Sequence, residues 1–229
     1  KPTGLSILSK DFMVVSTKFM PKDLHIYDDG KKVAAESFDY PDNVAYRCIG
    51  RLTKSNNTSA GFFLFTIFPE SLVLHEDLIC FDSDVTNALQ QFDPLLRQLC
   101  SNLGLGKISL TADHAGRYVH AKRDGIQFYQ SKDANRVFRA LKSFLASNNI
   151  QPNDVWVGQQ RAHSFDSLRE LINKSPLAFT QLKWTHENTQ LDVVVREGFD
   201  NNGNEILSNQ NLPLSKAFLL ANGVDNSWR

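Results

Sequence analysis

Asp82 and Asp84 are the residues whose types and spacing best suit chemistry. They follow the apolar run Leu78-Ile79-Cys80-Phe81, which is typical of a strand buried on both faces. Residues two positions apart on a strand project to the same side, and two neighbouring carboxylates repel each other unless a cation such as a divalent metal separates them. The pair therefore predicts a metal site at the carboxyl end of a sheet strand. The alternative is two solvated carboxylates, with Asp84 capping the next helix.

A second polar cluster is expected around Asp124-Gly125. This dipeptide is the strongest short hairpin signal, and residues 117–123 and 126–130 are the expected strands. In that register His120 and Lys122 share the polar face of the hairpin. Side chains here could donate to phosphate oxygens, although ordinary solvated surface is the alternative. The candidates are Arg117, His120, Lys122 and Arg123.

The elements that must position these residues mix strands and helices. Expected strands cover 4–8, 11–17, 45–52, 61–68, 78–81, 107–111, 155–157 and 191–196, and expected helices run from Asp93-Pro94 to Gly104, over 131–146 and from Ser164 to about 173. Residues 200–211, rich in Asn and Gly, are expected to form a loop. We expect a mixed α+β fold in one compact unit, with a β-rich portion over 1–75 and an α/β core with a C-terminal tail over 76–229.

Composition limits the classes of function. The chain has 229 residues, and its 25 Lys and Arg balance its 25 Asp and Glu. Proteins that coat nucleic acid are usually basic, so only a local basic strip is expected. The widely spaced Cys48, Cys80 and Cys100 form neither a disulfide framework nor a zinc motif. Because no apolar run approaches the roughly 20 residues of a membrane span, we expect a soluble, cytoplasmic protein without membrane contact.

The order of these features resembles a known family. The stretches "LICFDSDV", "LCSNLGLGKISLT" and "AGRYVHAKRDG" resemble the catalytic core of the archaeo-eukaryotic primase superfamily, and look most like the polymerase domain of bacterial end-joining ligases. The later "QLDVVV" resembles the strand that carries the third aspartate of that family, here Asp192. Asp154, before Val155-Trp156-Val157, is the alternative third ligand. The resemblance covers about residues 77–145 and 190–196.

The resemblance implies a primase-like sheet with flanking helices and a two-metal centre. Asp82, Asp84 and Asp192 would hold two Mg²⁺ or Mn²⁺ ions, one activating a 3′-hydroxyl group and one on the nucleoside triphosphate. His120 would contact the triphosphate, and Lys122 and Arg123 would add positive charge. The implied activity is nucleotidyl transfer on a single-stranded nucleic-acid template, and further domains or partner proteins are expected outside this stretch.

Two other classes of function stay open. "FDSDVT" resembles the opening motif of haloacid-dehalogenase phosphatases, in which Asp82 would be the nucleophile and Asp84 the acid. That fold usually begins with this strand, whereas here some 75 residues precede it. The other class is a non-enzymatic binding or regulatory domain, including a degenerate primase-like domain. Primer extension distinguishes the polymerase from both, and hydrolysis of small phosphoesters distinguishes the phosphatase.

Overall fold

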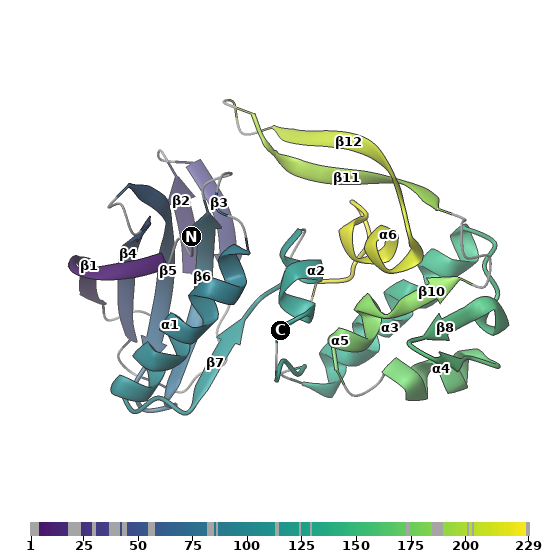
Figure 1. Ribbon diagram of the computed structural model, residues 1–229, viewed down its shortest axis with the longest axis horizontal. Helices are drawn as coiled ribbons and strands as arrows, with labels where there is room; N and C mark the ends of the chain where they lie inside the picture. The colour runs from purple at the N-terminus through teal and green to yellow at the C-terminus, as the bar shows by residue number, and fades with distance from the viewer. Residues whose placement is uncertain are drawn as a thin grey trace. The chain divides into compact units, whose positions relative to one another are not determined.

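The structure is a computed structural model in which two compact units are distinguished, residues 1–110 and 111–229. It describes residues 5–17, 24–28, 31–36, 42, 45–54, 58–81, 85, 87–112, 115–123, 125–128, 130–172, 175–184, 190–200, 202 and 204–227; for 5–17, 24–28, 31–36, 115 and 199 only the backbone is described. Strands come first along the chain and helices and strands mix after them, so the predicted mixed α+β class is confirmed (Figure 1). The boundary expected after residue 75 falls inside a strand, β6 (Val73–Phe81).

The N-terminal unit, residues 1–110, is built on a sheet of order β1-β4-β5-β6-β7. Its strands β1 (Leu5–Thr17), β4 (Ala45–Lys54), β5 (Ser59–Phe68) and β6 pair antiparallel, which confirms the predicted hairpin of 45–52 with 61–68. The last strand, β7 (Lys107–Leu110), pairs parallel with β6. A separate antiparallel ribbon is formed by β2 (Leu24–Asp28) and β3 (Lys31–Glu36).

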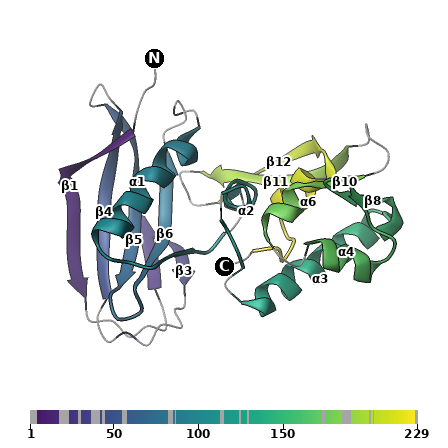
Figure 2. The ribbon, with the colours of Figure 1, turned by 60° about the horizontal axis from the view of Figure 1, so that its bottom comes forward.

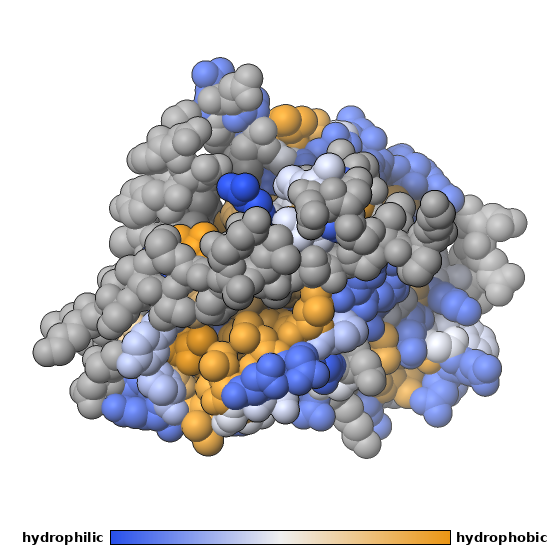
Figure 3. All heavy atoms as spheres, turned by 60° about the vertical axis from the view of Figure 1, so that its left-hand side comes forward, coloured by the Kyte–Doolittle hydropathy of each residue, from blue (hydrophilic) through white to orange (hydrophobic). Residues whose placement is uncertain are grey.

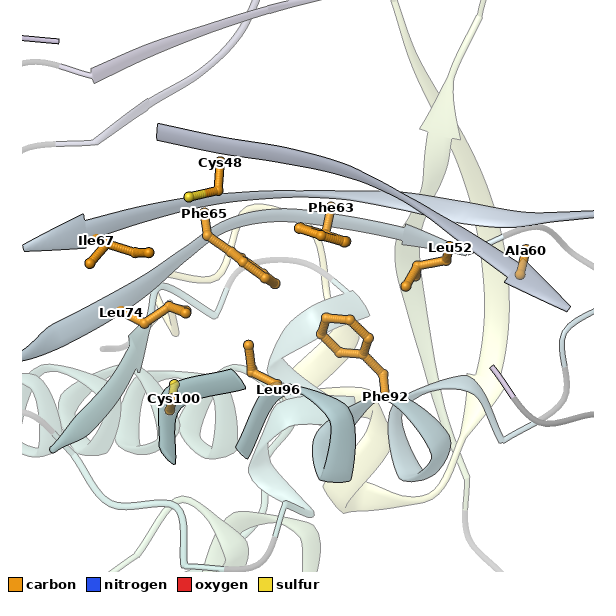
Figure 4. Packing of buried hydrophobic residues seen from close by; sticks show 10 residues of the cluster. All are labelled: Cys48, Leu52, Ala60, Phe63, Phe65, Ile67, Leu74, Phe92, Leu96 and Cys100. Carbon is orange, nitrogen blue, oxygen red and sulfur yellow. The ribbon is translucent and has the colours of Figure 1, made fainter. Parts of the chain in front are cut away.

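Helix α1 (Ala88–Asn102) connects β6 to β7 and covers one face of this sheet (Figures 1 and 2). Its buried residues Phe92, Leu96 and Cys100 recur every four positions and therefore line one side of the helix. They meet side chains from β4, β5 and β6 that point toward them from the sheet (Figure 4). The ring of Phe92 lies 6.2 Å from that of Phe63 and 6.0 Å from that of Phe65, so aromatic contacts fill the centre of this core.

The predicted start of this helix at Asp93-Pro94 is wrong, because α1 begins at Ala88 and contains Pro94 in its interior. Proline removes one helical hydrogen bond and crowds the preceding turn. Here it lies on the exposed side, whereas Phe92 is fully buried and holds the earlier turn against the sheet. The predicted end at Gly104 is confirmed. Gly104 has φ of 69°, and the N–H of Leu105 donates to the carbonyl oxygen of Cys100 over 2.9 Å, as in a Schellman motif.

The C-terminal unit, residues 111–229, surrounds a small sheet of order β10-β8-β9 with helices. Its elements are α2 (Ala115–Ala121), α3 (Ser131–Ser147), the 3₁₀ helix η1 (Pro152–Asp154), β8 (Val155–Val157), β9 (Gln160–Arg161), α4 (Phe165–Ile172), α5 (Leu177–Thr180), β10 (Leu182–Trp184), β11 (Leu191–Phe199), β12 (Glu205–Leu212) and α6 (Leu214–Leu220). The rings of Phe144 and Phe179 contact that of Phe218 at 5.6 and 5.8 Å, which joins α3, α5 and α6 in one core.

Most sequence predictions for this unit are confirmed. Helix α3 matches the predicted 131–146, and β8 matches 155–157. Ser164 caps α4 as predicted, since its hydroxyl oxygen accepts from the N–H of Ser167 over 3.2 Å. Among the helices of the described residues, none combines the length and apolar character needed to cross a lipid bilayer.

The predicted loop over 200–211 is wrong, because residues 205–212 form β12 and pair antiparallel with β11. Their polar composition reflects exposure on the ribbon rather than irregular backbone. The turn is shorter than predicted: the Asp200 carboxylate accepts from the backbone N–H groups of Asn202 and Asn204, each over 2.8 Å. Side-chain acceptors of this kind stabilise tight turns, so the ladder begins directly after them.

Candidate functional site

The carboxyl end of β6 directly precedes the predicted metal ligands Asp82 and Asp84. β6 pairs in parallel with β7 over Val73–Glu76, with α1 between the two strands in sequence, and the carboxyl end of β6 continues along β5, where Phe81 pairs with Gly61. Phe81, the last residue of β6, and Val85, four residues later, both pack against the core beneath α1. Asp82 and Asp84 lie between them in sequence but outside the described residues. Their predicted common orientation and metal binding therefore stay predictions.

The predicted hairpin around Asp124-Gly125 is wrong, because residues 115–121 form helix α2 and the described residues 126–128 form no strand. Asp124 itself lies outside the described residues. Arg117 and Ala121, one helical turn apart, are buried, and α2 packs against α6 and α5. Because side chains four positions apart share a helix face, tertiary packing selects a helix where the local turn signal indicated a hairpin. His120 and Lys122 therefore do not form the polar face of a strand.

His120 lies near the end of α2 and is half-buried. Its Nδ1 atom lies 3.1 Å from Nη1 of Arg123, which is always a donor, so Nδ1 accepts. Burial first, and then the positive charge of Arg123, lowers the pKa of His120 to about 3. The imidazole is therefore neutral near pH 7. It can orient Arg123, but it brings no positive charge to a triphosphate.

The basic side chains near His120 divide into two kinds. Arg117 is 3% exposed, and its guanidinium donates to the carbonyl oxygens of Ala221 over 3.3 Å and Val224 over 3.2 Å. These hydrogen bonds tie α2 to the segment after α6. Lys122 is instead exposed, with its Nζ atom 4.1 Å from the centre of the Tyr118 ring. Of the predicted phosphate contacts, Lys122 is thus accessible, and Arg117 serves the packing of the unit.

Neither candidate for the third metal ligand belongs to the unit that carries Asp82 and Asp84. Asp192 is exposed on β11, and its carboxylate accepts from the side-chain amide of Asn211, its partner on β12. Asp154 ends the 3₁₀ helix η1 and is half-buried. Within the part of the chain that the structure describes, no three His, Cys, Asp or Glu side chains gather closely enough to share a metal ion.

A partly buried polar row on the face of the sheet opposite α1 was missed by sequence reasoning. Strand pairing places four residues side by side across β4, β5, β6 and β7: Arg47, Thr66, His75 and Ser109. His75 is 1% exposed, and its Nδ1 atom lies 2.8 Å from Oγ of Ser109. A signal was present in the sequence, because His75-Glu76-Asp77 interrupts an otherwise apolar strand.

Asp77 lies two residues after His75 on β6 and contacts Thr66 of this row. The Thr66 hydroxyl group donates to Oδ2 of Asp77 over 2.6 Å, and both residues are buried. Burial lowers the pKa of Arg47, while the nearby Asp77 carboxylate opposes that shift. Opposite charges, on Arg47 and Asp77, thus lie close enough within the unit to influence each other. Farther along the same strands apolar side chains reach the surface, among them Ile49 and Phe62, and Figure 3 shows apolar area at the surface of the described residues.

Comparison with family models, with curated proteins and with solved structures gives no match for this chain.

Proposed function

We propose that this protein is a metal-dependent nucleotidyltransferase of the primase-polymerase type, with Asp82 and Asp84 as ligands of the catalytic ions. The observation that carries the proposal is the parallel pairing of β6 with β7 across α1, because Asp82 and Asp84 follow the carboxyl end of β6. Ligand sites of α/β sheets form at that end, and paired carboxylates suit Mg²⁺ or Mn²⁺. The family resemblance of the same stretch supports the proposal independently.

Each residue would have a defined role. Asp82 and Asp84 would hold the divalent ions, which when bound supply positive charge to the attacking and leaving oxygens. Asp192, its alternative Asp154, and the basic residues Lys122 and Arg123 belong to the other unit, and the roles that the family resemblance implies for them stay predictions. The low pKa of His120 restricts its imidazole to a neutral hydrogen-bonding role toward Arg123.

Extension of a labelled primer by nucleoside triphosphates tests this activity. The double variant D82N/D84N keeps side-chain size and removes both charges, so we expect the fold to survive and extension to be lost. The exposed Asp166 on α4 offers a matched control, and D166N should extend as the wild type does. D192N and D154N, assayed separately, identify which carboxylate is the third ligand.

The other outcomes are equally definite. Extension by wild type that persists in D82N/D84N would refute these ligands. Release of phosphate from small phosphoesters without extension would favour the phosphatase, with Asp82 as nucleophile. If both activities are absent and nucleotide causes no metal-dependent thermal shift, the protein is a non-enzymatic binding domain rather than an enzyme.

A further inference from the structure

The outer edge of β12 in the C-terminal unit is open to a further strand. β12 pairs with β11, and no other described strand pairs with it. The opposite edge of the ribbon is covered, because Val195 of β11 forms a bridge with Ala221 and the N–H of Asn222 donates to the carbonyl oxygen of Val194 over 2.7 Å. The ribbon also packs on α6 (Figure 1). β12 is therefore the edge strand of a ribbon that its own unit holds in place.

The hydrogen bond from Asn222 shows which backbone groups of β12 point outward. The N–H and C=O groups of one strand residue point to the same side, so those of Val194, which face Asn222, point away from β12. Val194 and its partner Asn209 therefore form a non-hydrogen-bonded pair, and the backbone groups of Asn209 point away from β11. This direction alternates along a strand, so the backbone groups of Leu207 and Asn211 point outward as well. Each of these β12 residues thus offers a donor and an acceptor at the open edge.

β12 lacks the features that usually protect an edge strand. Natural edges carry Lys, Pro or a β-bulge, which hinder pairing with another chain. Residues 205–212, "EILSNQNL", contain neither Lys nor Pro, and the bulge of this ribbon lies on β11. Their one charged side chain, Glu205, pairs with Arg196 of the same ribbon, Oε1 to Nη1 at 2.8 Å. Ile206 and Leu207 are 43% and 49% exposed. The edge therefore combines exposed apolar side chains with little charge, as a strand-pairing surface requires.

The outward backbone groups of β12 match those of a second, antiparallel copy of the same strand. With Asn209 opposite Asn209 of the second copy, Leu207 lies opposite Asn211. These are the residues whose N–H and C=O groups point outward, so each pair can exchange both hydrogen bonds of an antiparallel ladder. A register shifted by one residue in either strand would place outward groups opposite inward ones and lose these bonds.

The side chains of β12 match in the same register. On the face whose β11 neighbours are buried, Ile206 lies opposite Leu212 of the second copy and Ser208 lies opposite Gln210. Apolar side chains thus meet apolar ones, and polar side chains meet polar ones, which stabilises paired strands. Glu205 lies opposite the uncharged Pro213, so no like charges meet. The sequence of β12 is therefore complementary to itself.

We infer that this protein forms a dimer in which the β12 strands of two copies pair antiparallel and join their ribbons into one sheet. A two-fold axis through the Asn209 pair makes the interface the same surface in both copies, as a closed dimer requires. A peptide of unrelated sequence would gain the backbone hydrogen bonds of this edge but not the matched side chains. Pairing of one strand buries little surface, so the dimer should be in equilibrium with the monomer. It requires neither Asp82 nor Asp84.

Sedimentation of charge variants at position 209 tests this dimer. We expect wild type to approach twice its chain mass of 25.9 kDa at high concentration and to dissociate on dilution. In N209K, and likewise in N209D, like charges lie directly opposite each other at the two-fold axis, so each variant should dimerise roughly fivefold more weakly. An equimolar mixture of N209K with N209D places opposite charges together and should recover the dimer.

N209P provides a second measure. It removes an N–H group that points outward and none that pairs with β11, so it should sediment as a monomer and keep the circular dichroism spectrum of wild type. The matched control is N202K, which adds a lysine at the exposed turn of the same ribbon and should dimerise as wild type does. Three results would each overturn the inference: a wild type that is monomeric at every concentration, a loss in N202K equal to that in N209K, or a mixture of N209K with N209D that dimerises no better than either variant alone.

Discussion

The hydroxyl group of Thr66 on β5 donates a hydrogen bond to the Asp77 carboxylate on the neighbouring strand β6, over 2.6 Å and shielded from water. Replacing Thr66 with Val keeps the shape and removes the donor. A hydrogen bond to a buried charged group is worth about 1.5–3 kcal/mol, so we expect T66V to lower the free energy of unfolding by about that amount. Urea unfolding followed by circular dichroism measures the change.

The control for this prediction is T66S, which keeps the hydroxyl group and loses one methyl group. It should cost about 1 kcal/mol, the value of one buried methylene-sized group. A T66V variant as stable as the wild type would show that the hydrogen bond to Asp77 contributes nothing to stability.

Gly50 and Gly61 are required by close packing in the sheet of the N-terminal unit. A Cβ atom on Gly50 would overlap the ring of Phe63, and one on Gly61 would overlap the backbone carbonyl group of Cys80. Gly61 also has φ of 134°, which side chains rarely adopt. A ring can shift but the backbone cannot, so G50A should cost about 1–3 kcal/mol and G61A more.

G104A serves as the reference for these glycines. Gly104 has φ of 69° but open space around its Cβ position, so its substitution should cost about 1 kcal/mol from backbone strain alone. Of the three variants, G104A should have the highest melting temperature, G50A a lower one and G61A the lowest. A G61A variant that melts with or above G104A would contradict the close contact with Cys80.

The thiols should differ in reactivity. Burial raises the pKa of Cys48 and of Cys100 to about 11, with smaller contributions from Asp77 and Glu76 respectively. At pH 8 about one in a thousand of each thiol is ionised, and the thiolate is the reactive form. Cys80 is half-buried. We expect an aromatic disulfide reagent to modify Cys80 first in the native protein and all three thiols in guanidinium chloride, as mass spectrometry of peptides would show. Rapid native labelling of Cys48 would contradict its burial.

His120 should stay neutral far into the acid range. Its pKa of about 3 in the folded chain lies below the usual 6.5, so between these values the unfolded chain binds a proton that the folded chain does not. The stability that His120 contributes is therefore present above pH 6.5 and declines as the pH falls toward 3. Imidazole NMR signals, assigned by comparison with H120Q, should show no titration of His120 between pH 8 and 4 in the folded protein, but titration near 6.5 in urea.

Arg123 provides the second part of this experiment. Removing its charge in R123Q should raise the pKa of His120 partway toward 6.5, because burial, the larger cause, remains. A folded-state titration of His120 near 6.5 in wild type would show that the ring is accessible to water.

Much of the fold could be predicted where the local pattern and the packing agree. The apolar run of 61–68 matches a strand buried on both faces, and the helical spacing of 131–146 matches the buried face of α3. Prediction failed where the decisive contacts are distant in sequence. Asp124-Gly125 indicates a hairpin, but the contacts of Arg117 with Ala221 and Val224 favour a helix. Glu205–Leu212 has loop-like composition, yet pairing with β11 makes it a strand.

The candidate site was predictable only in part, for a related reason. The spacing of Asp82 and Asp84 after an apolar run is local, and the sequence shows it directly. The convergence of Lys122 and Lys216 on Tyr118 depends on the packing of α2 against α6, more than ninety positions apart, and no local pattern indicates it. The row from Arg47 to Ser109 likewise depends on strand register across four strands.

The order of strands in the N-terminal unit has a consequence for how this unit folds. β4, β5 and β6 are joined by the short segments 55–58 and 69–72, whereas β7 reaches β6 only after residues 82–106 have crossed the sheet. The entropy of closing a loop grows with its length, so the antiparallel meander forms before the parallel edge. β7 is also short, and among the described strands it pairs with β6 only. The parallel edge is therefore the last part of this sheet to assemble and the first to open.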